Sequence, residues 1–239
     1  TLLMPIVNND VSPWQDLVSA RGLGLDGIEV AAGAAQIGAT TTLTALGRDE
    51  RLAFLHPVVE SIASPLIRNL ATVGGNLFAP QPYGDLAVAL LALDAQVVIA
   101  GAEGERHAPV GQVLSAGVGP GEIVTQVSFA TPRPGTFFYT KAMRRKLNSA
   151  SIVTVAAVIE QAGSKVDSAR IVLGGAGPRP VRAPNAEAAL AGKPLNLETV
   201  TAASDLALMD AAPFTDAYAS AWYRARVLPV HIRRAILGA

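Results

Sequence analysis

The residues best suited to chemistry are five consecutive positions in the first third of the chain: Thr72, Val73, Gly74, Gly75 and Asn76. Two successive glycines allow positive φ angles and a close approach of the backbone to a ligand. Successive N–H groups can then converge on an anion such as a pyrophosphate. The threonine hydroxyl and the asparagine amide can add neutral hydrogen bonds. The alternative is a plain Gly-Gly turn, because the segment matches neither the G-x-G-x-x-G fingerprint nor a P-loop.

Asp85 lies just beyond this segment, after a loop that contains Pro80 and Pro82. Its carboxylate could accept hydrogen bonds from ribose hydroxyls, or it could simply cap the helix that follows. A second glycine pair, Gly174-Gly175, leaves a similar choice. It could bind phosphate, or it could form a turn from a strand to a helix.

The composition excludes several other kinds of site. Lys+Arg and Asp+Glu each number 19, so no net charge recruits nucleic acid. The chain has no cysteine, which excludes disulfides, thiolate-ligated iron–sulfur clusters and cysteine nucleophiles. Its three histidines, His56, His107 and His231, are scattered without metal-ligand spacing. No apolar run reaches the roughly 18 residues that a transmembrane segment requires.

The length and the proline pattern predict two domains. The chain begins at Thr1 with no signal peptide before it, so we expect a cytoplasmic protein and a fragment or processed product of a longer chain. Its 239 residues suffice for two modest domains. Residues 131–135 contain two prolines and a glycine, which disfavour both a helix and a central strand. The predicted domains are residues 1–132 and 133–239.

Periodicity and turn residues predict an α+β fold. In the first domain, strands are expected at 27–32, 35–39, 96–100, 105–108 and 123–129. Helices are expected there at 41–46, 56–64 and 85–93. In the second domain, strands are expected at 136–141, 151–161 and 166–173, and helices at 183–191, 197–209 and 217–237.

The sequence from Ile67 to Leu77, Ile-Arg-Asn-Leu-Ala-Thr-Val-Gly-Gly-Asn-Leu, resembles the second flavin loop in the FAD subunits of molybdenum hydroxylases. That family includes xanthine dehydrogenases and carbon monoxide dehydrogenases. Residues 84–95 continue the likeness, and residues 171–183 are similar to the family's C-terminal domain. The resemblance implies a two-subdomain FAD-binding domain of the vanillyl-alcohol-oxidase-like kind. A small C-terminal domain would follow, with helices on a three-stranded antiparallel sheet.

The resemblance also implies the roles of individual residues. The segment 72–76 would bind the FAD diphosphate, and Asp85 would contact the adenosine end. Lys141 resembles a lysine near the flavin, where a positive charge stabilises the reduced, anionic ring; the alternative is a solvated lysine at a strand end. Val124 takes the place of an apolar residue whose backbone approaches the isoalloxazine. Residues 1–5 match only the tail of the family's first flavin loop, so the N-terminal part of the FAD-binding domain is missing. The predicted cofactor-binding residues are Thr1, Thr72, Val73, Gly74, Gly75, Asn76, Asp85, Val124 and Lys141.

The same resemblance implies that the cofactors are distributed over three different chains. A small subunit would carry 2Fe–2S clusters, a large subunit would carry the molybdenum cofactor, and this chain would carry FAD, within a dimer of heterotrimers. This chain would pass electrons from the clusters to an external acceptor, with no catalytic residue or metal ligand of its own. Two alternatives remain: a non-redox nucleotide-binding or scaffold subunit, and a self-contained flavin oxidase. The arginines of the last predicted helix could dock a partner or form a solvated face; they are Arg224, Arg226, Arg233 and Arg234.

Overall fold

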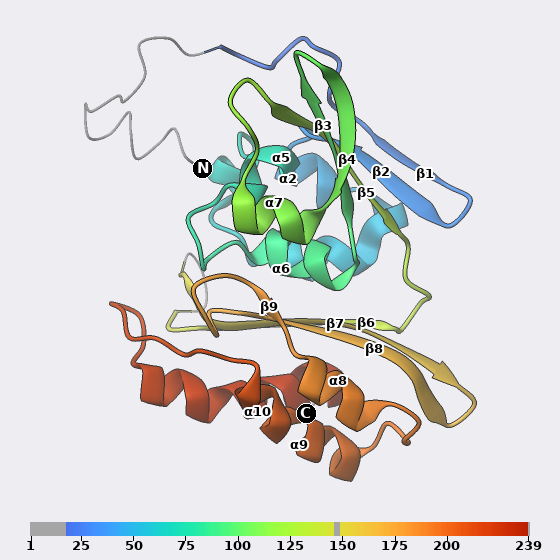
Figure 1. Cartoon of the computed structure of the whole chain (residues 1–239), viewed down its shortest axis with the longest axis vertical. Coiled ribbons are helices and arrows are strands. Elements are labelled where there is room, and N and C mark those ends of the chain that lie inside the picture. The colour runs from blue at the N-terminus through green and yellow to red at the C-terminus, as the bar shows by residue number, and fades with distance from the viewer. Residues whose placement is uncertain (1–17, 146–148, 239) are drawn as a thin grey trace.

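The computed structural model describes residues 18–145 and 149–238 (Figure 1). Within these residues, two antiparallel sheets form the framework: a five-stranded sheet in the order β1-β2-β5-β3-β4 and a four-stranded sheet in the order β6-β7-β8-β9. The first sheet contains β1 (Ile28–Ala31), β2 (Ala34–Gly38), β3 (Gln96–Gly101), β4 (Gly104–Pro109) and β5 (Ile123–Ala130). The second contains β6 (Phe137–Met143), β7 (Ser151–Ala162), β8 (Lys165–Gly174) and β9 (Val181–Arg182).

Helices separate and cover the two sheets in layers (Figure 1). Those of the first half are α2 (Leu43–Leu46), the 3-10 helix η1 (Glu50–Leu55), α3 (His56–Glu60), α4 (Pro65–Arg68), α5 (Val73–Leu77), α6 (Asp85–Ala92) and α7 (Val110–Ala116). Those of the second half are α8 (Pro184–Leu190), α9 (Leu197–Leu206), the 3-10 helix η2 (Ala207–Met209) and α10 (Ala221–Leu237). The last group packs on the face of the four-stranded sheet that points away from the first sheet.

Helix α6 lies between the two sheets and joins them. Nearly all of its side chains are buried, which is what a helix that is apolar on every side requires. It packs against β7 and β8 of the second sheet as well as against helices of the first half. The hydrophobic core of the first half therefore includes Ala156 and Val172, which belong to the second sheet.

Local sequence explains the elements that were predicted well. The hairpin β1–β2 turns through Ala32 and Gly33, which both have positive φ, as a two-residue hairpin turn requires. Helix α2 begins where the Thr42 side chain accepts a hydrogen bond from the backbone N–H of Ala45. The predicted mix of helices and antiparallel strands is confirmed, and no helix among the described residues is long and apolar enough to cross a membrane.

The structure adds one strand to the predicted elements and changes the bounds of two predicted helices. The second sheet has a fourth strand, β9, whose Val181 pairs with Leu173; two residues give no periodicity to detect. The helix predicted at 56–64 ends at Glu60, and Ala63 beyond it has a φ of 48°. The helix predicted at 217–237 begins only at Ala221, because the Ser220 side chain caps it there.

Candidate functional site

The segment predicted to be a flavin loop is the start of a helix. Thr72 is the N-cap of α5, and its hydroxyl accepts a hydrogen bond from the Gly75 N–H at 3.1 Å. Neither Gly74 nor Gly75 has a positive φ, so the predicted use of these glycines for left-handed backbone is wrong. The capping threonine explains the difference, because it starts a helical turn in which both glycines take ordinary helical angles.

The N–H groups predicted to converge on an anion donate to acceptors within the protein in this structure, and the binding of the FAD diphosphate by this segment stays a prediction. The Val73 N–H donates to the Thr41 carbonyl and the Gly74 N–H to the Ala39 carbonyl, each at 2.9 Å. The Gly75 and Asn76 N–H groups both donate to Thr72, to its hydroxyl and its carbonyl. All four donors are therefore used inside the protein.

Gly74 is required by close packing rather than by its φ angle. A Cβ atom at this position would lie 2.8 Å from the Ala39 Cβ and 3.0 Å from the Ala39 carbonyl oxygen. Real Cβ atoms do not approach this closely, so the absence of a side chain lets α5 sit directly against the end of β2. This contact fixes the position of Asn76 on the next part of the helix.

Asn76 is one of the residues that line a cavity of about 470 Å³. The residue is only 4% exposed, and its Oδ1 atom has no hydrogen-bond partner among the described residues. A buried amide oxygen without a donor is costly unless a ligand satisfies it. The cavity draws its lining from both halves of the chain: Ile62, Ala63, Ser64, Ile67, Asn76, Ala79, Tyr83, Asp85, Lys141, Ser149 and Ala150.

Asp85 and Lys141 form a buried ion pair on the wall of this cavity. The Lys141 Nζ lies 2.7 Å from the Asp85 Oδ2, and the two side chains are 4% and 6% exposed. Lys141 also donates to the Ser61 carbonyl at 2.8 Å, and the Thr154 hydroxyl donates to the Asp85 Oδ1 at 2.8 Å. Burial raises the pKa of Asp85, and the bonds from Lys141 and Thr154 act in the opposite direction.

This pair settles two of the alternatives that the sequence left open. Asp85 does not cap its helix, because Gly84 is the N-cap of α6 and no side chain caps it. Lys141 is not a solvated lysine, because its ammonium group is buried against Asp85. The contact of Asp85 with the adenosine end of FAD stays a prediction.

A second, partly buried network reaches the same cavity from the C-terminal half. The Tyr83 hydroxyl donates to the Asp216 carboxylate, which also accepts from the Arg224 Nη2 at 2.7 Å. Arg224 is fully buried, so the arginines of α10 do not all belong to a solvated face. Although burial raises the pKa of Asp216, hydrogen bonds from Tyr83, two backbone N–H groups and Arg224 leave it below its ordinary value. This network was not predicted, because nothing in the sequence marks Tyr83 and Asp216, 133 positions apart, as partners.

The ionisation of Tyr83 gives a direct measure of this network. Burial, followed by the hydrogen bond and charge of Asp216, raises the pKa of Tyr83 from 10.0 to about 12. The network's contribution to stability is therefore complete below pH 10 and is lost as the pH rises toward 12. The ultraviolet titration of tyrosinate in the wild type, minus that of Tyr83→Phe, should show a midpoint near 12. A difference curve centred near the ordinary tyrosine value would contradict the buried hydrogen bond.

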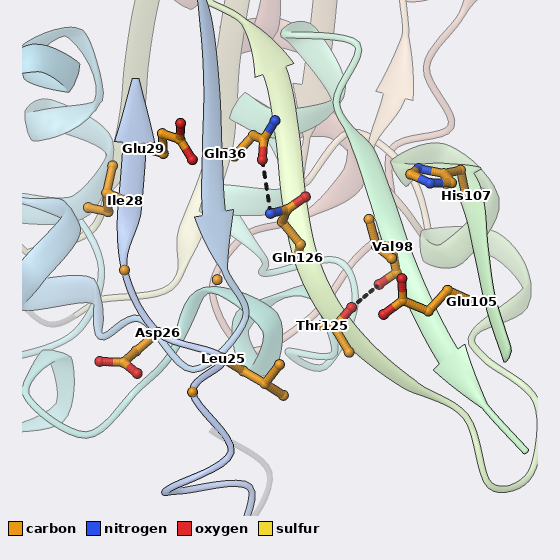
Figure 2. A pocket seen from close by; sticks show the side chains of 13 residues that line it. Leu25, Asp26, Ile28, Glu29, Gln36, Val98, Glu105, His107, Thr125 and Gln126 are labelled. Carbon is orange, nitrogen blue, oxygen red and sulfur yellow. Dashed lines mark hydrogen bonds between the residues drawn. The ribbon is translucent and has the colours of Figure 1, made fainter. Parts of the chain in front are cut away.

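Val124 does not line the cavity that Asn76, Asp85 and Lys141 share. It is buried in β5 opposite Ile99, at a bulge where the register with β3 shifts. The next residue, Thr125, faces a different cavity of about 600 Å³ on the open side of the five-stranded sheet (Figure 2). That cavity is polar, with the Thr125 hydroxyl bonded to the Val98 carbonyl and the Gln126 amide to Gln36.

The structure therefore brings together only some of the predicted residues. Asn76, Asp85 and Lys141 line one cavity. The other predicted residues of this segment, Thr72 to Gly75, form the start of the helix that carries Asn76. None of the predicted residues that the structure describes lines the sheet-face cavity of Figure 2. Thr1 lies outside the described residues.

Comparison with known proteins places the chain in one family over its whole length. Residues 1–132 match the family described as "FAD binding domain in molybdopterin dehydrogenase", and residues 138–239 match the "CO dehydrogenase flavoprotein C-terminal domain". The chain is 30% identical to the carbon monoxide dehydrogenase medium chain of Afipia carboxidovorans, over 98% of this chain and 84% of the relative. It is 31% identical to a putative xanthine dehydrogenase FAD-binding subunit of Escherichia coli, over 93% of this chain and 80% of the relative.

Solved structures agree with this assignment. The crystal structure of the cyanide-inactivated Cu,Mo-CO dehydrogenase superposes with a TM-score of 0.89 at 30% identity, covering 99% of this chain and 86% of that chain. Quinoline 2-oxidoreductase from Pseudomonas putida gives a TM-score of 0.90 at 26% identity, covering 100% of this chain and 86% of that chain. The predicted fold class is confirmed by these neighbours. The chain belongs to the FAD-binding, or medium, subunits of the molybdenum hydroxylases, a family of oxidoreductase components.

Proposed function

We propose that this chain is the electron-transfer subunit of a molybdenum-hydroxylase complex. Its FAD, when bound, accepts electrons from 2Fe–2S clusters on a small partner chain and passes them to an external acceptor. A large partner chain carries the molybdenum cofactor and oxidises the substrate, within a dimer of heterotrimers in the cytoplasm. The observation that carries the proposal is the cavity that Asn76, Asp85 and Lys141 line in a chain that belongs to an FAD-binding family. The buried Asn76 oxygen has no hydrogen-bond partner among the described residues.

The cavity residues suit one part of a flavin dinucleotide. The volume of the cavity, about 470 Å³, falls within the range of small-molecule sites and is large enough for part of an FAD molecule. Ile62 and Ile67 give the cavity an apolar wall, Tyr83 an aromatic one, and Asn76 a polar amide. Such a mixture of apolar walls with a few placed polar groups is typical of cofactor sites. We propose that Thr72 to Gly75 support this site by holding Asn76, without binding the diphosphate through their own N–H groups.

Lys141 acts in this site as half of a neutral pair. Two of its three ammonium hydrogens are bonded to Asp85 and to the Ser61 carbonyl, which leaves one for a ligand. The nearby Asp85 carboxylate offsets most of its positive field. We propose that Lys141 orients an acceptor atom of the cofactor and contributes less to the stability of an anionic ring than an isolated lysine would.

The chain's composition requires partners for the relay. It has no cysteine and therefore cannot hold an iron–sulfur cluster itself. We propose two domains, residues 1–132 and 133–239, each of which contributes residues to the lining of the cavity. A stable interface with the iron–sulfur chain should bury more than roughly 1,000 Å².

The native complex should contain about one non-covalent FAD for each copy of this chain. Acid precipitation should release all of the flavin into the supernatant, and iron and molybdenum should co-elute with the chain. Substrate added without oxygen should bleach the clusters before the flavin. Removal of FAD should leave the reduction of the clusters intact and stop transfer to the acceptor.

Three results of this experiment would contradict the proposal, each in a different way. A complex that holds iron and molybdenum but no flavin would indicate a scaffold. A lone chain that binds FAD and turns over substrate unaided would indicate a self-contained oxidase. Flavin that stays on the acid precipitate would show a covalent bond that the proposal does not contain.

A further inference from the structure

Tyr83 is the aromatic residue on the wall of the cavity that Asn76, Asp85 and Lys141 line. It lies in the Pro-rich loop between α5 and α6, within the first half of the chain. The groups that hold it come from the second half. Its hydroxyl donates to the Asp216 carboxylate, and its ring meets the Tyr218 ring edge-on, with centroids 5.5 Å apart.

Asp216 is itself held rigidly. Its Oδ1 accepts the backbone N–H groups of Tyr218 and Ala219 at 2.8 and 2.9 Å, and its Oδ2 accepts from Tyr83 and Arg224. These contacts leave the carboxylate little freedom to rotate. The Tyr83 hydroxyl is therefore directed to one point.

Arg224 anchors the other end of this network. Its guanidinium group donates to the carbonyls of Ile152 and Gly175 and lies 4.4 Å from the centroid of the Phe214 ring. A fully buried arginine is expensive to maintain, and apolar residues of similar volume often pack at least as stably. A reason beyond stability is therefore needed for this arrangement, and the position of Tyr83 on the cavity wall supplies one.

We propose that Tyr83 is a cofactor-binding residue whose ring packs against a planar ring of the flavin dinucleotide, and that Asp216 is a positioning residue that holds this ring from the C-terminal half. The inference rests on the proposed function, since it concerns the same cavity. Two parts of FAD share the required chemistry, the isoalloxazine and the adenine, because both are flat heteroaromatic rings. The C-terminal half thereby completes a site that the first half only partly encloses.

Two substitutions at Tyr83 separate its ring from its hydrogen bond. Tyr83→Ala removes both, and Tyr83→Phe keeps the ring and removes only the bond to Asp216, with the Asp216–Arg224 pair left in place. Tyr218→Phe is the matched control, because Tyr218 touches the outer edge of Tyr83 and is not part of the cavity lining. Each full chain, with any partner chains that co-purify, would be stripped of flavin and titrated with FAD, FMN and ADP.

Tyr83→Ala should weaken FAD binding roughly tenfold, because an aromatic pair contributes about that factor beyond its buried area. Tyr83→Phe should recover most of this affinity but change the circular dichroism of the bound cofactor, because the ring of residue 83 is no longer held in one orientation. The change is expected in the visible flavin bands if the ring packs on the isoalloxazine and in the ultraviolet adenine band if it packs on the adenine. Tyr218→Phe should match the wild type in both measurements. Weaker binding of FMN would identify the isoalloxazine as the partner of Tyr83, and weaker binding of ADP would identify the adenine; either result supports the proposal.

The failure of this inference can be told apart from the failure of the proposed function. A wild type that binds no FAD overturns the proposed function, and the role of Tyr83 falls with it. A wild type that binds FAD, with Tyr83→Ala equal to it in affinity, overturns the role of Tyr83 alone. Unchanged circular dichroism of the bound cofactor in Tyr83→Phe, in the visible flavin bands if FMN binding is weakened and in the ultraviolet adenine band if ADP binding is weakened, overturns the positioning role of Asp216.

Discussion

Replacing Lys141 by methionine should lower the free energy of unfolding by about 3–5 kcal/mol. The substitution leaves the Asp85 carboxylate in a site that is almost closed to water, with the Thr154 hydroxyl as its remaining side-chain donor. A buried charge without its counterion is far more costly than the pair was favourable. Denaturant unfolding of the full chain measures the loss. Lys165→Met is the control, because Lys165 is exposed and its replacement should change stability by less than about 0.5 kcal/mol.

A double-mutant cycle tests the origin of this loss. Asp85→Asn keeps an acceptor for Thr154 and removes the charge, so the double variant Asp85→Asn/Lys141→Met no longer contains an unpaired ion. It should be more stable than the sum of the two single losses predicts. Strict additivity would mean that the two residues do not interact, and would contradict the 2.7 Å ion pair.

Gly74→Val should destabilise the protein by about 1–3 kcal/mol and reduce its flavin content. Its new side chain would collide with the Cβ and carbonyl oxygen of Ala39, which are backbone-fixed atoms that cannot move aside. Moving Ala39 would in turn disturb its N–H bond to the Thr125 carbonyl, at 2.9 Å. The displacement would also shift Asn76, whose side chain we place in the cofactor site.

The alanine variant makes the test sharper. In a helix, Gly→Ala is normally stabilising by up to about 1 kcal/mol, so a loss of stability in Gly74→Ala can come only from the close approach. Gly177→Ala is the control for an added methyl group without a clash, because Gly177 lies outside the helices and a Cβ atom there would make ordinary contacts of 3.7 Å or more. If the Gly74→Ala protein were as stable as the wild type, the backbone at Ala39 could move away from the new methyl group, and the predicted loss of stability would be contradicted.

Much of the fold follows from local sequence, and the exceptions have physical causes. The hairpin at 28–38 and the helix at 85–92 were predicted because alternation and apolar character are local properties. The start of α10 was predicted too early, because Asp216 accepts the N–H groups of Tyr218 and Ala219 and holds them in a turn. The apolar pattern of a segment predicts a helix but does not show where a polar side chain will accept backbone N–H groups and so delay the start of that helix.

The candidate site was only partly predictable for a related reason. Asn76 was selected as an amide beside the glycine pair and Lys141 by resemblance, and both line one cavity. The geometry expected of the two glycines was wrong, because a glycine pair fits a capped helix as well as a left-handed turn. The pairing of Asp85 with Lys141 spans 56 positions, and no local pattern shows which opposite charges will meet when the chain folds.

The burial of α6 between the two sheets packs the two halves of the chain into a shared core, so we expect them to unfold together. The backbone amides of α6 can meet solvent only when both sheets separate, so their hydrogen–deuterium exchange should proceed through global unfolding. Neither half can open like a hinge without exposing this apolar helix. The proposed electron-transfer role would gain from such rigidity, because the separation between donor and acceptor would then stay constant throughout turnover.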